Sequence, residues 1–209
     1  MIISQYGGPD GELSASMRYL AQRYTMPVKE VGGLLTDIGT EELAHMEMIC
    51  AMVYQLTRDL TIEEAKTAGF DAYYVDHTKA LWPQAAAGLP FSALEFTAKG
   101  DAITDLTEDL AAEQKARTVY DNLLRMITDP EVREPLKFLR AREIVHFQRF
   151  GEALEKTKDK LDPRNYYYFN PEFDKLEGLP KFCPFKKAFS LKIHKIFQIN
   201  VCSADTYFL

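Results

Sequence analysis

Two short segments of the sequence each place a carboxylate and an imidazole three residues apart. They are ELAH, with Glu42 and His45, and EIVH, with Glu143 and His146, and they hold two of the four histidines of the chain. A spacing of i and i+3 puts both side chains on one face of a helix, where together they can bind a metal ion. Either pair alone is weak evidence, because glutamates on helices are mostly solvated.

Two single glutamates, Glu12 and Glu113, share the context of these pairs. Like the pairs, they lie on stripes of apolar residues spaced by three and four, which is the pattern of a helix face that packs into a core. Each stripe belongs to a different expected helix, so four helices would direct acidic or imidazole groups inward. The expected helices cover about residues 11–24, 28–57, 101–128 and 131–157.

The core of a helical bundle normally excludes ionised carboxylates, since burying one without a partner costs several kcal/mol. Inward-facing glutamates from four helices therefore need cations. Two divalent metal ions, each bound by carboxylate oxygen and one imidazole nitrogen, would supply them. One glutamate on each of two helices and a Glu-x-x-His pair on each of the other two is the known ligand arrangement of di-iron and di-manganese bundles. Ligand types alone do not choose manganese over iron, because both metals accept carboxylate and imidazole.

The elements that position these residues indicate an all-α fold. Residues 58–100 form a long connection between the second and third helices, with one short helical piece in the segment TIEEAKTAG. A crossover of this length suits a ferritin-like four-helix bundle whose two middle helices run parallel. We expect the bundle in residues 1–161 and an extended C-terminal tail in 162–209, where apolar and polar residues alternate over 191–201 and indicate a strand.

Composition and charge limit the classes of function. A chain of 209 residues supports one well-buried core, and its net charge of −6 argues against nucleic-acid binding, which needs a cationic face. No apolar run is long enough to span a membrane, and the first residues lack the pattern of a secretion signal. The three cysteines form no CxxC motif, so disulfide scaffolds and zinc ribbons are not expected and a reducing compartment such as the cytoplasm fits best.

Other polar residues near the pairs receive a different interpretation. Four acidic residues fall off the apolar stripes and are expected at the solvated surface: Glu41, Glu47, Asp109 and Glu152. Tyr19 lies on the stripe of the first helix, seven residues after Glu12. It is either a hydrogen-bond donor to the metal ligands or an ordinary core tyrosine, and the sequence does not choose between these roles.

In the stretches GGPDGELSASMRYLAQRY, LLTDIGTEELAHMEMI, DLTEDLAAEQKAR and LKFLRAREIVHFQRFGEAL, the sequence resembles the non-haem manganese catalases. The resemblance covers most of residues 6–156 and is strongest to the short type associated with bacterial spore coats. It implies a ferritin-like fold, two manganese ions per chain, and disproportionation of hydrogen peroxide to water and oxygen. It also implies a homo-oligomer, a hexamer by family analogy, in the cytoplasm or in the spore coat with other coat proteins as partners.

Carried over by position, the resemblance assigns five metal ligands. Glu12 and His45 would bind one manganese ion. Glu113 and His146 would bind the other. Glu42 would bridge the two ions.

Glu143 receives a separate role from the resemblance, as a proton carrier that does not bind metal. Such a role needs a carboxyl group in a dry pocket within hydrogen-bond reach of the solvent that bridges the two metals. One departure from the family pattern lies nearby. Some members carry a basic residue close to the third ligand, whereas Ala112 precedes Glu113 here.

Three functions follow from these observations. The leading one is an enzyme, a dimanganese catalase. The second is a structural component of the spore coat that keeps the metal site and serves in assembly. The third is a di-iron relative of ferritin or rubrerythrin, which stores iron or reduces peroxide with an external electron donor. Absence of a CxxC motif counts against a rubrerythrin, because that protein carries an additional iron site of this kind.

Overall fold

The computed structural model describes residues 1–94 and 97–161, and every regular element in them is helical. Met1–Lys160 form one compact unit. The long helices are α2 (Glu12–Gln22), α3 (Lys29–Thr57), α6 (Ala102–Met126) and α7 (Pro130–Lys160). The short ones are α1 (Ser4–Gly7), the 3-10 turn η1 (Arg23–Thr25), α4 (Ile62–Thr67) and α5 (Asp71–His77). None of these described helices combines the length and apolarity needed to cross a membrane.

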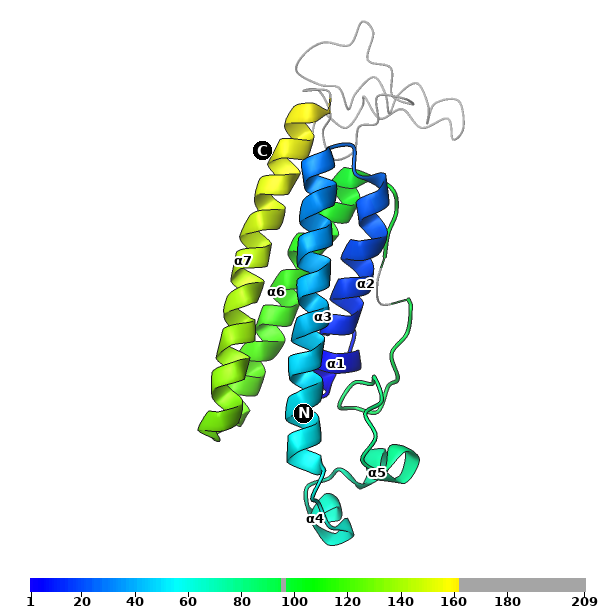
Figure 1. Cartoon of the computed structure of the whole chain (residues 1–209), viewed down its shortest axis with the longest axis vertical. Coiled ribbons are helices and arrows are strands. Elements are labelled where there is room, and N and C mark those ends of the chain that lie inside the picture. The colour runs from blue at the N-terminus through cyan, green and yellow to red at the C-terminus, as the bar shows by residue number, and fades with distance from the viewer. Residues whose placement is uncertain (95–96, 162–209) are drawn as a thin grey trace, which may run out of the picture. The chain divides into compact units, whose positions relative to one another are not determined.

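The four long helices lie side by side as a bundle (Figure 1). α2 packs along α3, and α6 packs along α7. The long connection crosses from one end of the bundle to the other, so that α3 and α6 run in the same direction, as expected for a ferritin-like fold (Figure 1). At the end of this crossover the Nε2 atom of Gln22 donates a hydrogen bond of 2.9 Å to the carbonyl of Thr97, which fixes the connection against α2.

Local sequence explains where the helices begin. The side chain of Asp101 accepts a hydrogen bond from the backbone N–H of Thr104 and caps α6. Thr61 and Glu64 form a reciprocal capping box at the start of α4. Pro130 opens α7, where its missing N–H costs nothing. The helix predicted within the connection is present as α4, whereas α1 and α5 were not predicted.

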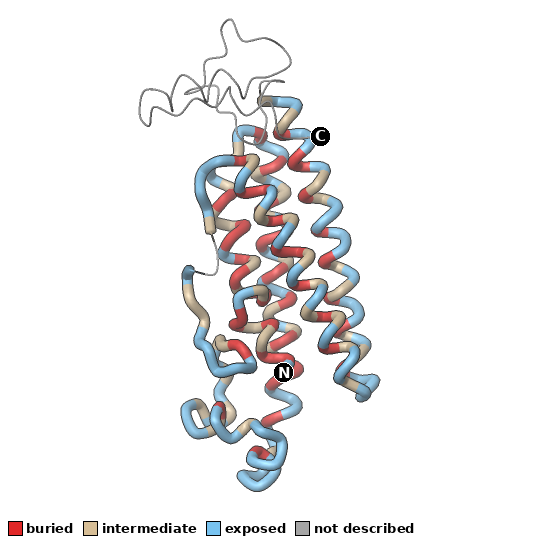
Figure 2. Tube along the Cα trace, turned by 180° about the vertical axis from the view of Figure 1, so that it is seen from behind, coloured by how far each residue is buried: buried red, intermediate tan, exposed pale blue. Residues whose placement is uncertain are grey.

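Buried residues follow the predicted stripes on three of the four long helices, on the sides that face one another (Figure 2). α6 differs, because its buried face also includes Asp109 and Ala116, which lie off the predicted stripe. Arg117 lies four residues after Glu113 and in line with it on the predicted apolar stripe, yet it is half-buried and pairs at 2.6 Å with Asp121 one turn later. The buried face of α6 is therefore rotated from the predicted one, because alanines and an aspartate form part of it.

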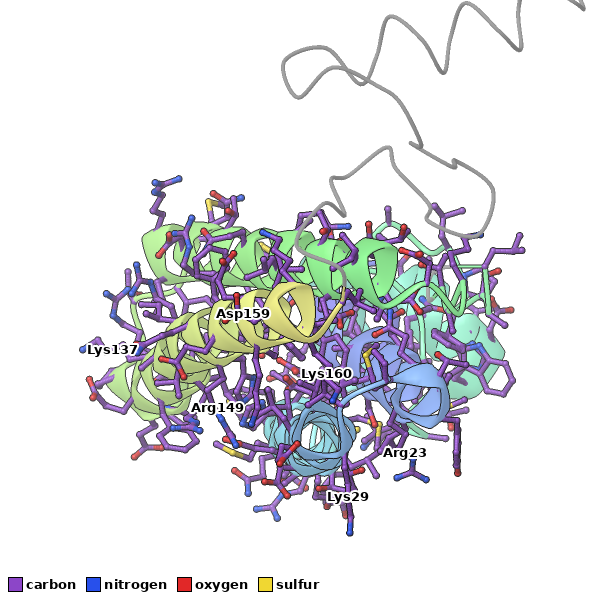
Figure 3. The ribbon with its side chains drawn as sticks, turned by 90° about the horizontal axis from the view of Figure 1, so that it is seen from above. Arg23, Lys29, Lys137, Arg149, Asp159 and Lys160 are labelled. Atoms are coloured by element: carbon purple, nitrogen blue, oxygen red, sulfur yellow. The ribbon has the colours of Figure 1, made fainter. Side chains whose placement is uncertain are left out.

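α2 and α3 approach closely at Gly39. A Cβ at this position would lie 2.8 Å from Cγ of Leu20, so no larger residue fits without displacement. The Ser16 hydroxyl donates a 2.7 Å hydrogen bond to the Gly39 carbonyl, which joins the two helices at the same level. Viewed along the bundle, Arg149 of α7 lies on the side towards α3, where its Nη2 is 3.6 Å from the Asp37 carboxylate (Figure 3).

The expected tail, with its strand over residues 191–201, lies outside the described residues. The division of the chain into a bundle over 1–161 and a tail over 162–209 therefore stays a prediction.

Candidate metal centre

All six residues singled out by the sequence meet inside the bundle. They come from four helices and each is at most 2% exposed. The set consists of Glu12 on α2, Glu42 and His45 on α3, Glu113 on α6, and Glu143 and His146 on α7.

The six side chains form two overlapping groups that could each hold a metal ion. In one group, atoms of Glu12 and His45 join those of the two shared glutamates, all within 4.8 Å of one another. In the other, Glu113 and His146 join the same shared glutamates. The shared residues are Glu42 and Glu143, so two centres can lie next to each other with two carboxylates between them.

The carboxylate of Glu42 faces both histidines at once. Its Oε2 atom lies 2.6 Å from Nδ1 of His45, and its Oε1 atom lies 2.7 Å from Nδ1 of His146. The same nitrogens approach the unshared glutamates less closely, at 3.7 Å for Glu12 and 3.6 Å for Glu113. In this geometry a single carboxylate can offer one oxygen to each of two neighbouring ions.

Several buried polar atoms of the cluster make no hydrogen bond. They include Oε1 of Glu42, Oε2 of Glu113, Oε1 of Glu143 and both ring nitrogens of His146. The close approach of His146 to Glu42 therefore lacks hydrogen-bond geometry. Buried polar atoms without a partner are costly, and metal coordination would satisfy them. The donor set of carboxylate oxygens and imidazole nitrogens fits a divalent transition metal.

Two tyrosines hold the unshared glutamates. The Tyr19 hydroxyl donates a hydrogen bond of 2.5 Å to Oε1 of Glu113. The Tyr120 hydroxyl donates a short hydrogen bond to Oε1 of Glu12. Both rings are fully buried. The sequence left the role of Tyr19 open, and the structure shows it as a donor to a member of the site.

The acidic members of the cluster have divergent proton affinities. Burial and the charge of Glu42 raise the pKa of Glu12 to about 8. Burial would also raise the pKa of Glu42, but its contacts with His146 and His45 outweigh this and lower it to about 2. Burial and three surrounding glutamates raise the pKa of Glu143 well above its ordinary value. Glu42 therefore stays ionised most readily, and the neighbouring glutamates bind protons more tightly.

The histidines are strongly basic in the absence of metal. Burial would lower the pKa of His45, but Glu12 and Glu42 raise it to about 10. For His146, burial is likewise outweighed by Glu113 and Glu42, which raise the pKa to about 11. Metal binding at these nitrogens must therefore displace protons.

Two of the acidic residues that we expected at the solvated surface are buried or half-buried instead. Asp109 is fully buried one turn before Glu113 on α6, and burial raises its pKa well above the ordinary value, opposed by Gln22 and the charge of Arg18. Glu41 is half-buried, and Arg142 contacts it with two N–H groups at 2.6 and 3.2 Å. A signal existed for both, because Asp109 is four residues before Glu113 and Glu41 is four before His45. The other two, Glu47 and Glu152, are exposed as expected.

Comparison with known proteins points to one family. Residues 1–181 match the family described as manganese containing catalase. Protein CotJC of Bacillus subtilis is 54% identical over 166 residues, which are 79% of this chain and 87% of that protein. A probable manganese catalase of Clostridium acetobutylicum is 36% identical over 171 residues, which are 78% of this chain and 72% of that protein. The crystal structure of KatB, a manganese catalase from Anabaena, superposes with a TM-score of 0.71 at 27% identity, covering 81% of this chain and 76% of that one.

A bundle of four helices with buried glutamates and histidines at its centre defines a ferritin-like protein whose core offers ligands for metal ions. Within that class, the chain belongs to the family of manganese-containing catalases.

Proposed function

We propose that this protein is a dimanganese catalase that converts hydrogen peroxide into water and oxygen. The observation that carries the proposal is the position of Glu42, whose two oxygens face the Nδ1 atoms of His45 and His146. A bridging carboxylate of this kind sets two ions close enough to act on one small molecule. Membership of the manganese catalase family supports manganese as the metal and peroxide as the substrate.

Five residues would hold the ions. In this proposal Glu12 and His45 would bind one ion, Glu113 and His146 would bind the other, and Glu42 would bridge them; these residues belong to the two groups that could hold a metal ion. When bound, the two manganese ions supply a pair of redox centres that together take up or release two electrons. The protein contributes a dry pocket, since every one of these side chains is at most 2% exposed.

Glu143 moves protons in this proposal. Oxidation of one peroxide to oxygen releases two electrons and two protons, and reduction of a second peroxide to two waters consumes them as its O–O bond breaks. A carboxyl group that accepts one of these two protons in the first half and returns it in the second couples the two, while the other proton is released to solvent and taken up from it again. Burial and the neighbouring Glu12 raise the pKa of Glu143, so it readily takes a proton, and its Oε1 atom has no hydrogen-bond partner.

An oxygen-evolution assay tests the activity. Protein loaded with manganese should release one oxygen for every two peroxides consumed, without any added reductant. Peroxide consumption that needs an electron donor and releases no oxygen would contradict the proposal and indicate a rubrerythrin-like reaction. A manganese-loaded protein with no effect on peroxide would also contradict it.

A structural role in the spore coat is the second candidate. The sequence resembles the short, coat-associated type of the family, and the 54% identity to Protein CotJC exceeds the 36% identity to the probable manganese catalase. Under this proposal the protein is found in the coat fraction of purified spores. Its retention there should be the same in a variant without catalytic activity.

We also propose that the chain forms a homo-oligomer, a hexamer by family analogy. Two of the large apolar side chains that α7 exposes, Phe138 by 51% and Val145 by 38%, lie seven residues apart and therefore on the same face of the helix. Clusters of exposed apolar side chains usually mark protein contacts. A stable monomer at micromolar concentration in light scattering would contradict this assembly.

A further inference from the structure

The two candidate ligand histidines share one neighbour on the side away from the cluster. Nε2 of His146 lies 3.1 Å from Oε2 of Glu41, and Nε2 of His45 lies 3.4 Å from Oε1 of the same residue. The rings are stacked, with centroids 5.6 Å apart and planes 19° from parallel. Their Nδ1 atoms face Glu42 while their Nε2 atoms face Glu41, so the rings lie between two carboxylates.

We propose that Glu41 is a positioning residue that accepts the Nε2–H of both histidines and thereby couples the two metal positions. This proposal rests on the proposed function, because it takes Nδ1 of each ring as the metal ligand. A neutral imidazole that binds metal through one nitrogen carries its proton on the other. That N–H usually donates to a carboxylate, which fixes the ring and makes it a stronger electron donor to the metal.

The carboxylate of Glu41 has room for both histidines and for its cation. Arg142 donates to Oε1 through Nε at 2.6 Å and to Oε2 through Nη2 at 3.2 Å. An ionised carboxylate offers about four lone-pair sites, so two remain after this two-point contact. The histidine contacts are close but lie off the hydrogen-bonding direction, since both Nε2 atoms lack a hydrogen-bond partner. The proposal therefore requires each ring to rotate until its Nε2–H points at Glu41.

The charge of this pair sets the direction of the expected effects. Glu41→Gln keeps the shape and removes the negative charge, so both histidines donate less electron density. Arg142→Gln keeps the negative charge of Glu41 and removes the cation that competes with the histidine rings for it. Reduction potentials of the bound metals should therefore shift in opposite directions, upward for Glu41→Gln and downward for Arg142→Gln. A merely structural pair would not produce opposite shifts.

The test measures manganese affinity by chelator competition, together with the reduction potential, in the full-length protein. Glu41→Gln should weaken binding of both ions, each by about tenfold or more, which is the usual effect of losing such a partner. The matched control is Arg140→Gln, which breaks a similar half-buried pair between α7 and α6, Arg140 with Asp121. This control should leave affinity and potential unchanged, even where the bundle is less stable.

Failure of the inference is separable from failure of the proposed function. A wild-type chain that binds two manganese ions, with a Glu41→Gln variant of equal affinity and potential, overturns the inference and leaves the catalase proposal standing. Weakening of one ion alone also overturns it, because coupling requires both. A wild-type chain that binds manganese without releasing oxygen refutes the catalase activity but still tests Glu41. A wild-type chain that binds no manganese overturns both.

Discussion

The Tyr19 hydroxyl of α2 lies 2.5 Å from Oε1 of Glu113 on α6. Tyr120 of α6 makes the reciprocal contact with Glu12 of α2. A tyrosine on α2 thus orients the glutamate of α6, and a tyrosine on α6 orients the glutamate of α2. These exchanged contacts tie α2 to α6 across the interior, so the site and the packing of these helices depend on each other.

Tyr19→Phe tests this dependence. The change removes the donor to Glu113 and leaves a buried acceptor unsatisfied, which costs about 1–3 kcal/mol of unfolding free energy. Manganese affinity should fall by about tenfold or more, because the ligand is no longer held in place. Tyr73→Phe is the control, since that hydroxyl donates to the Ala80 carbonyl near α5 and should affect stability alone. Equal manganese affinity in Tyr19→Phe and wild type would refute the role of this contact.

Glu42→Gln should disrupt metal binding. The substitution removes the anionic charge that faces both His45 and His146, so two cations would repel each other without a bridge. Metal content should fall strongly, and the melting temperature measured with manganese should drop towards that of the metal-free protein. Normal manganese content in this variant would show that Glu42 is not the bridge.

Glu143→Gln should separate proton transfer from metal binding. Glutamine keeps the shape of the side chain and removes its titratable proton. Manganese content should stay near that of the wild type, while oxygen release should fall by about a hundredfold or more. The geometry makes this comparison informative, because Glu143 lies in both metal-binding groups, as Glu42 does. If Glu143→Gln loses its metals as fully as Glu42→Gln, then Glu143 is a ligand.

The sequence predicted the four long helices and the inward residues because the pattern behind them is local. Glu-x-x-His pairs in register with leucine and isoleucine report directly on one helix face. Glu41 and Asp109 were misassigned because the apolar stripe is narrower than the buried face, which also includes polar residues held by other helices. Arg142 lies 101 residues from Glu41, and no local sequence pattern predicts a pairing over that distance.

Tyr120 also shows that local patterns do not predict contacts between distant residues. It lies seven residues after Glu113 and in line with it on the predicted stripe, yet its partner Glu12 is 108 residues away and belongs to another helix. The two short helices α1 and α5 were missed because few residues carry their periodicity. Their positions depend on contacts with the rest of the unit, such as the hydrogen bond from the Ala86 N–H to the Ser4 hydroxyl.

Stability of the metal-free protein should depend on pH in a defined direction. The pKa is raised to about 10 for His45 and to about 11 for His146. Protonation of these histidines therefore contributes fully to the free energy of unfolding below about pH 6.5, the pKa of histidine in the unfolded chain. This contribution is lost as pH rises through the folded-state pKa values. Glu12, with a pKa of about 8, acts in the same direction. Glu42, with a pKa of about 2, stabilises above about 4.5 and loses this effect only in acid.

The melting temperature of the metal-free protein should therefore fall between pH 7 and pH 10. With manganese bound the fall should be smaller, because metal replaces the protons on the histidines and binds more tightly as pH rises. Parallel thermal melts of the two forms over this range check the prediction. A metal-free melting temperature that stays constant or rises would contradict the assigned proton affinities.

The most direct test of the account is the metal content of the natively purified, full-length protein, measured by mass spectrometry of its metals. The proposed set of five ligands, of which Glu42 is the bridge, predicts about two manganese ions per chain. Stoichiometric iron in place of manganese, or a chain that carries no metal, would contradict the account.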